Sequence, residues 1–460
     1  MAPQGIADPF LDRLREDLSG EVLTSGEIGY DEARAVFNAM IDRHPAIIVQ
    51  CETDEDVAAA VRFGRDHELP VSVRGGGHSV AGMALVDDGL VVDLRRMHAV
   101  SVDPVGRTVR VGGGATMSHL DRATEPFGLA TTGGRVSTTG VGGFTLGGGT
   151  GWLDRKLGLA CDNLTAVDLV TAEGERVHAS EDENPELFWA LHGGGGNFGV
   201  ATSLTLRLHP VAGVTVLLLL WQAEAGPGVL RTYRDFVESA PPEAGGGFIF
   251  LTGPPEEFVP EHLVGNLLGA ALVTYVGTEQ QARKAAAPLL DLGPEAAMIA
   301  EMPYAELQCM LDDPPGLRNY WSAEYLDSFP DEAADVFCDR ARTMIVPSAS
   351  QHVLFPQGGA VADDSAGYPV PWRTAPWIVH PFGLWENPAD DERGRQWVRD
   401  VRSDMQPWSN GTVYLNFIGN EGEQRVVAGF GAENFERLAA VKTQYDPDNV
   451  FSRNHNIRPQ

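Results

Sequence analysis

Glycine is concentrated in one short stretch of this chain. Residues 133–151 read GGRVSTTGVGGFTLGGGTG, and nine of these nineteen residues are glycine. Glycine loses more backbone freedom on folding than any other residue, so it is tolerated in such numbers where backbone must approach something closely or adopt positive φ. Further clusters lie at 75–77, 112–114 and 193–196. Four such loops indicate turns of chain that line one extended ligand and could bind a pyrophosphate through their N–H groups, although glycine-rich turns in a β-rich domain are the alternative.

Composition excludes several classes of protein. A chain of 460 residues is too long for one ordinary core, so two or three substructures are expected. The formal net charge of −30 argues against a nucleic-acid partner, because such a partner needs a basic surface. Four widely spaced cysteines without a CxxC pair suit neither a disulfide framework nor a metal site.

Nothing in the chain predicts a membrane partner. The longest apolar run, VTVLLLLW at 214–221, has the length of a strand. The first residues, MAPQGIADPFLDRLRED, show neither a basic region nor an apolar core, so we see no signal peptide and expect a cytoplasmic protein. The sequence leaves the oligomeric state open.

The hydrophobic pattern indicates a mixed α+β protein. HPAIIVQ predicts a strand, residues 52–69 a helix capped by Thr53 or Asp54, and VSVRGG a second strand, which together form a strand–helix–strand unit. Past Pro210 the glycine clusters thin out, and long strands alternate with helices such as TEQQARKAAAPLLDL. The tail holds one amphipathic helix and an asparagine-rich end.

Familiar nucleotide and hydrolase motifs fit poorly. There is no GxxxxGK[ST], and no GxGxxG lies between a strand and a helix, so the fold is not expected to be of the Rossmann type. GHSVA at 77–81 is one residue short of the GxSxG of a nucleophile elbow. A serine hydrolase built on Ser79 therefore remains an alternative.

Five motifs stand in a specific order along the chain: RGGGHS (74–79), GVGGFTLGGGTGWL (140–153), GLACDNL (158–164), NFGV (197–200) and YDPDNVF…NHNI (445–457). Together they resemble the berberine bridge enzyme-like flavin oxidases of the vanillyl-alcohol oxidase superfamily. The resemblance covers nearly the whole chain and is weakest at about 215–345. It implies an α+β fold with a two-part FAD-binding domain (1–210), a substrate domain with an antiparallel sheet backed by helices (211–410), and a C-terminal segment (411–460) that returns to the FAD domain.

The resemblance also implies FAD as the cofactor. In the family, the histidine of the first motif bonds to the flavin 8α carbon, and in bicovalent members a cysteine bonds to flavin C6; these roles fall on His78 and Cys161. A lone cysteine with apolar neighbours is otherwise usually buried and inert. The other cofactor-binding residues implied are Arg74, Gly75, Gly76, Gly77, Ser79, Thr138, Gly140, Gly142, Gly143, Asp162, Gly199, Val200, Asn416, Asn454 and Asn456.

Three residues are implied in catalysis. Family members that oxidise carbohydrates or antibiotic precursors place a basic tyrosine in a Tyr-x-Asn pattern, which Tyr414-Leu-Asn416 matches. An ordinary tyrosine has a pKa of about 10, so the site would have to lower it through another polar group or the flavin itself. His352 in the strand SQHVLFPQGGAV is a second polar candidate, and the small Thr139 would leave room for O₂ beside the flavin. The alternatives are a tyrosine paired across a sheet and a surface-strand histidine.

We therefore expect a bicovalent FAD oxidase that takes a hydride from a hydroxyl-bearing, bulky substrate and reduces O₂ to H₂O₂. A carbohydrate and a secondary-metabolite intermediate are the two substrate hypotheses. A dehydrogenase or an oxidative cyclase of the same fold, a serine hydrolase, and a flavin-binding module without activity are the alternatives.

Overall fold

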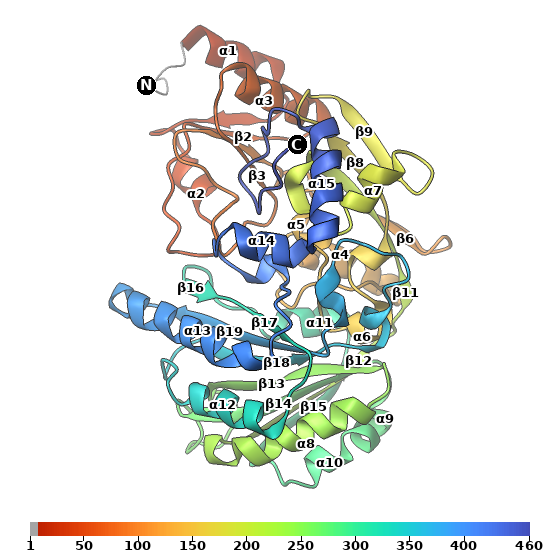
Figure 1. Cartoon of the computed structure of the whole chain (residues 1–460), viewed down its shortest axis with the longest axis vertical. Coiled ribbons are helices and arrows are strands. Elements are labelled where there is room, and N and C mark those ends of the chain that lie inside the picture. The colour runs from red at the N-terminus through yellow and green to blue at the C-terminus, as the bar shows by residue number, and fades with distance from the viewer. Residues whose placement is uncertain (1–7) are drawn as a thin grey trace.

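The computed structural model describes residues 8–460 and consists of three sheets of different construction, together with a short two-stranded pairing. The two sheets before residue 210 form the upper part of Figure 1, and the large third sheet forms the lower part. None of the helices among residues 8–460 is long and apolar enough to cross a membrane.

The first sheet is mixed and has the order β1-β2-β4-β3. β2 pairs in parallel with β4, as β3 does, whereas β1 is antiparallel to β2. The predicted strand–helix–strand unit is confirmed, since β2 (Ile47–Gln50), α3 (Asp54–Asp66) and β3 (Val71–Arg74) follow one another. Thr53 caps α3 in a reciprocal capping box with Asp56. The remaining elements of this part are α1 (Asp8–Asp17), β1 (Glu21–Leu23), α2 (Tyr30–Arg34) and β4 (Leu90–Asp93).

The second sheet is antiparallel and has the order β5-β6-β10-β8-β9. Short helices and the glycine-rich loops lie between its strands along the chain. Its strands are β5 (Val100–Asp103), β6 (Thr108–Gly112), β8 (Leu164–Val170), β9 (Arg176–Ser180) and β10 (Val200–Arg207). The helices and the short pair of strands beside it are α4 (Met117–Thr124), β7 (Leu129–Ala130), α5 (Val141–Leu146), α6 (Asp154–Leu157), α7 (Pro185–Ala190) and β11 (His209–Pro210).

The third sheet has eight strands in the order β15-β12-β14-β13-β18-β19-β16, with β17 also paired to β19, and all pairs are antiparallel. The α+β fold with an antiparallel sheet backed by helices is thus confirmed. The strands are β12 (Val214–Gln222), β13 (Ala244–Thr252), β14 (Leu267–Tyr275), β15 (Ala296–Met302), β16 (Arg318–Trp321), β17 (Glu324–Leu326), β18 (Gln351–Pro356) and β19 (Trp377–Trp385). The helices between or after them are α8 (Gly226–Ser239), α9 (Glu279–Ala285), α10 (Ala287–Leu290), α11 (Tyr304–Cys309), α12 (Asp331–Ala341) and α13 (Asp391–Met405).

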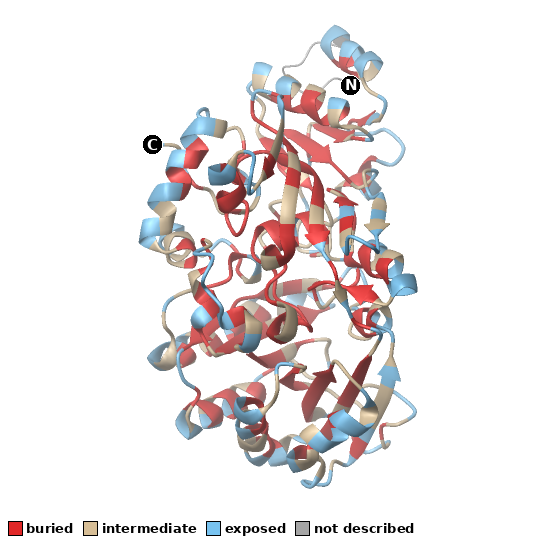
Figure 2. Ribbon diagram, turned by 90° about the vertical axis from the view of Figure 1, so that its right-hand side faces the viewer, coloured by how far each residue is buried: buried red, intermediate tan, exposed pale blue. Residues whose placement is uncertain are grey.

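Alternate residues of the third sheet have different surroundings. Leu354 packs with α8, α12 and α13 in one apolar cluster, whereas Val353 and Phe355 belong to a second cluster on the opposite face. Figure 2 shows buried residues running through the sheets and exposed residues along the outer helices. The sheet therefore has one face sealed by helices and one face turned toward the rest of the protein.

The chain after residue 410 lies against the first part. It holds two helices rather than the one predicted, α14 (Glu423–Phe430) and α15 (Ala432–Tyr445), separated by Gly431 with a φ of 78°. In Figure 1 both lie beside the upper half of the protein. The predicted helix TEQQARKAAAPLLDL is likewise divided, into α9 and α10, because Pro288 cannot continue a regular helix.

Candidate active site

A cavity of about 390 Å³ lies where three parts of the chain meet. The first part contributes residues from the loops 75–79, 134–152 and 193–199. The third sheet contributes side chains from β13, β16, β18 and β19, and the C-terminal part contributes 414–418 and 451–455. Segments far apart in sequence therefore enclose one space of a size usual for ligand sites.

Glycines shape this cavity in two ways. A Cβ atom on Gly76 would lie 2.3 Å from the nitrogen of Gly140, and one on Gly140 would lie 2.4 Å from the nitrogen of Gly76, so the two loops cross with their backbones in contact. In contrast, a Cβ atom on Gly143, Gly195 or Gly196 would meet no atom within 4 Å, although all three residues line the cavity. The cavity wall therefore exposes backbone both at Gly143 and at Gly195 and Gly196, which fits an elongated cofactor.

His78 lies in the loop that follows β3 and lines the cavity. Its ring stacks on Phe37, with centroids 4.2 Å apart and planes at 20°, and its Nε2 lies 2.8 Å from Oγ1 of Thr138. Burial lowers the pKa of His78 to about 4. The ring is consequently neutral near pH 7 and keeps a nitrogen lone pair for bond formation.

Most of the predicted site residues line the cavity. They share a position at the end of a strand, in a glycine loop or in the C-terminal part. The lining residues among them are Gly75, Gly76, Gly77, His78, Ser79, Thr139, Gly140, Gly142, Gly143, Gly199, Tyr414, Asn416 and Asn454.

Cys161 does not reach the cavity. It is fully buried, and its backbone nitrogen donates to the carbonyl of Gly148, so it lies behind the glycine loop that forms the cavity wall. Burial raises the pKa of the Cys161 thiol well above its usual value, which opposes the thiolate that a bond to flavin would need. The prediction that Cys161 and His78 converge on one ring therefore disagrees with the structure.

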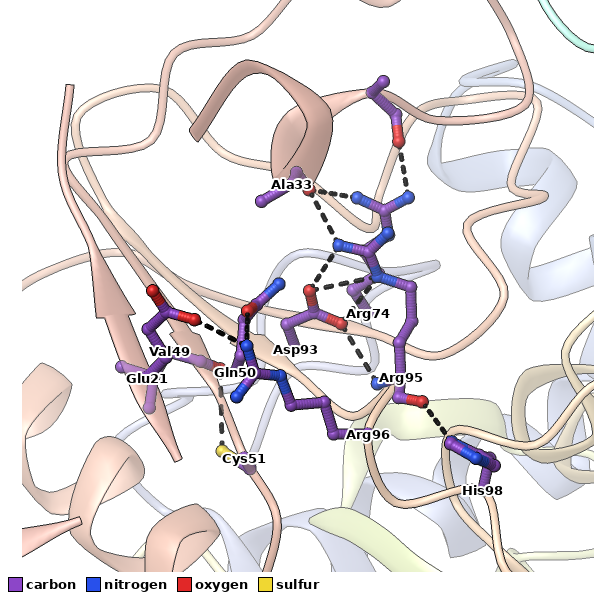
Figure 3. A network of polar contacts seen from close by, with 11 residues as sticks. Glu21, Ala33, Val49, Gln50, Cys51, Arg74, Asp93, Arg95, Arg96 and His98 are labelled. Carbon is purple, nitrogen blue, oxygen red and sulfur yellow. Dashed lines mark hydrogen bonds and ion pairs between the residues drawn. The ribbon is translucent and has the colours of Figure 1, made fainter. Parts of the chain in front are cut away.

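Arg74 also faces away from the cavity. Its guanidinium donates to the carbonyls of Ala33 and Ala35, and the neighbouring Arg95 binds both oxygens of Asp93 (Figure 3). Burial lowers the pKa of Arg74 to about 10. Arg74 thus ties β3 to the end of α2 and does not supply the predicted contact with the cofactor.

Four other predicted cofactor residues lie outside the cavity wall. Asp162 accepts two hydrogen bonds from the buried Arg373, at 3.0 and 2.8 Å, and so fastens its loop to the chain before β19. Val200 is buried in the core at the start of β10, and Asn456 lines a second, smaller cavity beside the first. Thr138 does not line the cavity, and its hydroxyl is hydrogen-bonded to Nε2 of His78.

His352 lies on the wrong face of the third sheet to act on a substrate. It stacks on Phe337 of α12, with centroids 3.8 Å apart, and contacts Trp397 of α13 edge to face. Its neighbours Gln351 and Val353 line the cavity instead, because successive side chains of a strand point to opposite faces. The prediction of a catalytic His352 is wrong for this reason.

Tyr414 lines the cavity, and its hydroxyl is hydrogen-bonded within the protein. Its hydroxyl lies 3.5 Å from the carbonyl of Phe144 and accepts a hydrogen bond of 2.8 Å from Asn416. Burial raises the pKa of Tyr414 above its usual value, although the Asn416 bond opposes this change. A lowered pKa of Tyr414 therefore stays a prediction for the flavin-bound protein, in which the Asn416 bond and the flavin would both have to oppose burial.

Sequence reasoning missed several polar residues of the cavity, among them His380, Arg135 and Asp313. His380 on β19 lines it, with Nδ1 2.8 Å from the carbonyl of Ser322. The guanidinium of Arg135 lies 4.0 Å from the centroid of the Phe355 ring and donates a hydrogen bond to the carbonyl of Thr150. Asp313 lines the cavity too, and its Oδ2 bonds to none of the described residues. Only Arg135, placed inside the glycine-rich stretch, gave a signal that could have been read.

The structure does not support the serine hydrolase alternative, because Ser79 has no neighbouring base in the described part of the chain. The hydroxyl of Ser79 accepts a hydrogen bond from the backbone nitrogen of Met83, at 3.3 Å. Within residues 8–460, no histidine lies within hydrogen-bond distance of this hydroxyl. A serine nucleophile needs such a base, so Ser79 is not activated.

Comparisons with known proteins agree with this geometry. Residues 45–180 match the family described as "FAD binding domain", and residues 413–458 match "Berberine and berberine like". An uncharacterized FAD-linked oxidoreductase of Bacillus subtilis is 30% identical over 455 residues, which cover 96% of this chain and 97% of that one.

A second relative has a named substrate. (R)-6-hydroxynicotine oxidase of Paenarthrobacter nicotinovorans is 31% identical over 473 residues, with 96% of this chain and 97% of that one covered. The crystal structure of 6-hydroxy-D-nicotine oxidase from Arthrobacter nicotinovorans superposes with a TM-score of 0.86 at 27% identity, over 96% of this chain and 98% of the other. The chain therefore belongs to the berberine bridge enzyme-like FAD-linked oxidoreductases.

Proposed function

We propose that this protein is an FAD-dependent oxidase whose flavin is held by one covalent bond, to His78. The observation that carries the proposal is the position of this neutral ring on the cavity wall, beside the crossing of the Gly76 and Gly140 loops. No cysteine of the described residues lines the cavity, which favours one bond over two. A ring nitrogen of His78 would form a C–N bond to the flavin 8α carbon. The N–H hydrogen of His78 and one hydrogen of the 8α methyl group would pass, with two electrons, to the flavin ring. O₂ would then reoxidise the reduced flavin.

The chain's own residues bind and orient the cofactor. We assign the FAD-binding domain to residues 1–210, the substrate domain to 211–410 and the closing segment to 411–460. The backbone N–H groups of the exposed cavity glycines, Gly143, Gly195 and Gly196, can donate to a pyrophosphate. Asn416 and Asn454 line the same wall, and the Oδ1 of Asn454 is buried without a partner among the described residues, so it is free for the cofactor.

FAD, when bound, accepts a hydride from the substrate and passes its electrons to O₂, which yields H₂O₂. Thr139 lines the cavity with a small side chain, which leaves space for O₂. This residue supports an oxidase rather than a dehydrogenase.

The substrate we propose is bulky, largely apolar and carries a hydroxyl group. Aromatic and aliphatic side chains form the wall contributed by the third sheet and its neighbours: Phe37, Ile249, Leu311, Trp321, Val353, Phe355 and Phe382. A carbohydrate presents hydroxyl groups on most of its carbons, and burying them against such a wall without partners would be costly. The relative named for 6-hydroxynicotine is consistent with an aromatic substrate.

Acid precipitation tests the proposal directly. The washed pellet should stay yellow, and a tryptic digest should carry flavin on the peptide that contains His78 and none on the peptide that contains Cys161. Peroxide release during turnover should accompany substrate oxidation. A colourless pellet with a yellow supernatant would show that the flavin is not tethered, and turnover without peroxide would point to a dehydrogenase.

A further inference from the structure

His380 and His352 lie on neighbouring strands but face opposite ways. In the register of β18 and β19, Val353 is opposite His380 and His352 is opposite Pro381. His352 is consequently enclosed by α12 and α13, whereas His380 lines the cavity together with Val353 and Phe382. Of these two buried histidines, His380 alone is placed to touch a substrate.

The hydrogen bond of His380 determines which nitrogen is free. Nδ1 lies 2.8 Å from the carbonyl oxygen of Ser322, and a carbonyl can only accept, so Nδ1 carries the hydrogen. Nε2 then has a lone pair, and no described residue donates to it. The ring is held by stacking on Phe417, with centroids 4.3 Å apart and planes at 17°. The structure thus presents a fixed, unoccupied hydrogen-bond acceptor to the cavity.

Tyr414 is a more restricted acceptor than His380. Asn416 donates to one of the two lone pairs of its hydroxyl oxygen, and the hydroxyl lies 3.5 Å from the Phe144 carbonyl. Phe417 contacts both rings, since it stacks on His380 and meets Tyr414 edge to face at 4.9 Å. The two side chains therefore belong to one wall, but they differ in what they can do for a hydroxyl group.

We propose that Nε2 of His380 accepts the hydrogen bond of the substrate hydroxyl and takes its proton when the adjacent C–H bond gives a hydride to the flavin. The O–H and C–H bonds break, a C=O bond forms, and the two electrons leave with the hydride. The substrate is oxidised and FAD is reduced, and O₂ then restores it. This inference rests on the proposed function.

The surroundings of His380 suit a weak acceptor rather than a strong base. Burial lowers the pKa of His380 to about 3, and the positive charge of Arg135 adds to the effect. The other titratable groups that line the cavity are Tyr414, Asp313, His78, Arg453 and His455, and His352 lies behind the strand. A weak acceptor holds the hydroxyl without deprotonating it beforehand, so proton and hydride leave together.

Two fluorinated probes can separate a hydrogen bond from apolar packing. 4-Fluorophenol and fluorobenzene differ by one hydroxyl group, and ¹⁹F NMR titration of the flavin-loaded protein gives both dissociation constants. In His380→Phe, 4-fluorophenol should bind roughly 5- to 100-fold more weakly, the range for a buried hydroxyl left without its partner, while fluorobenzene should bind as before. His352→Phe is the matched control, and it should change neither constant.

Other results would overturn the inference. Equal weakening of both probes in His380→Phe would make His380 a wall residue only. A hydroxyl-specific loss in Tyr414→Phe with none in His380→Phe would transfer the role to Tyr414. Should His380→Phe fail to fold, ¹⁵N-histidine NMR of the wild-type protein decides: the Nε2 signal of His380 must shift with 4-fluorophenol and stay unchanged with fluorobenzene.

These outcomes are distinguishable from failure of the proposed function. Untethered flavin or an absence of peroxide would refute the covalent oxidase and leave the probe comparison interpretable. A hydroxyl-specific loss without peroxide would keep the role of His380 and assign a different electron acceptor.

Discussion

Lys442 is a buried cation that joins the C-terminal part to the cavity wall. Its side chain is 0% exposed, and Nζ donates to Oδ2 of Asp446 at 2.6 Å and to the carbonyls of Asn197 and Phe451 at 2.8 and 3.0 Å. Asp446 in turn accepts from the backbone nitrogens of Val450 and Phe451. Asn197 and Phe451 both line the cavity, so one ammonium group holds two segments of its wall together.

Replacing Lys442 by methionine keeps most of the side-chain volume and removes the charge. Asp446 would then be a buried carboxylate without its counter-ion, which costs about 3–5 kcal/mol of unfolding free energy. The double variant Lys442→Met/Asp446→Asn should recover much of this loss, because no uncompensated charge remains. Arg342→Met is the control: its ion pair with Asp339, at 2.7 Å, is exposed, and removing it should cost at most about 1 kcal/mol.

Urea unfolding followed by circular dichroism and by release of flavin fluorescence measures these differences. In Lys442→Met the flavin fluorescence should also rise at a lower urea concentration than in the wild-type protein, since the wall segments separate first. If Lys442→Met is destabilised by no more than Arg342→Met, or if the double variant is worse than the single one, the buried-pair reasoning is wrong.

Three further predictions follow from the cavity. His78→Ala should abolish acid-stable flavin on the protein while Cys161→Ala retains it fully, as measured on denaturing gels under ultraviolet light; loss of the linkage in Cys161→Ala would contradict the assignment. Gly76→Ala should cost about 1–3 kcal/mol of stability or more, because its Cβ would overlap backbone. Gly143→Ala should leave the stability of the flavin-free protein within about 1 kcal/mol of the wild-type value but reduce flavin incorporation. A normal flavin content in Gly143→Ala would show that the cofactor lies elsewhere. Burial and the neighbouring Asp312 raise the pKa of Asp313 to about 7, so its carboxyl becomes negatively charged as the pH rises from 6 to 8. The affinity for benzylammonium, measured by calorimetry, should therefore increase over this range in the wild-type protein. It should stay constant in Asp313→Asn.

The local parts of the fold could be predicted from the sequence because they depend on neighbouring residues. The strand, the Thr53 cap and the helix after it form a self-contained pattern, and all three are present. The helix predicted across Pro288 is too long, because the prediction followed a run of good helix formers and not the one residue that interrupts them. Gly431 divided the tail helix in the same way.

The site was harder to predict, because its side chains depend on partners remote in sequence. A period of two shows that His352 and Val353 face opposite sides of a strand, but a strand buried on both faces does not reveal which side holds the ligand. Asp162 finds its partner Arg373 more than two hundred residues away, and Arg74 binds carbonyls rather than a phosphate. His380 follows no motif, and only the pairing of β18 with β19 brings it to the cavity.

The make-up of the cavity wall bears on how the protein matures on the ribosome. Residues 414–418 and 451–455 leave the ribosome after every strand of the three sheets, yet they complete the enclosure around His78. Domains tend to fold in the order of their synthesis, so the earlier parts can form while this wall is still missing. Loading with flavin, and formation of its bond to the protein, would then be among the last events of biogenesis, and translation that stops short of α15 would yield protein without bound flavin.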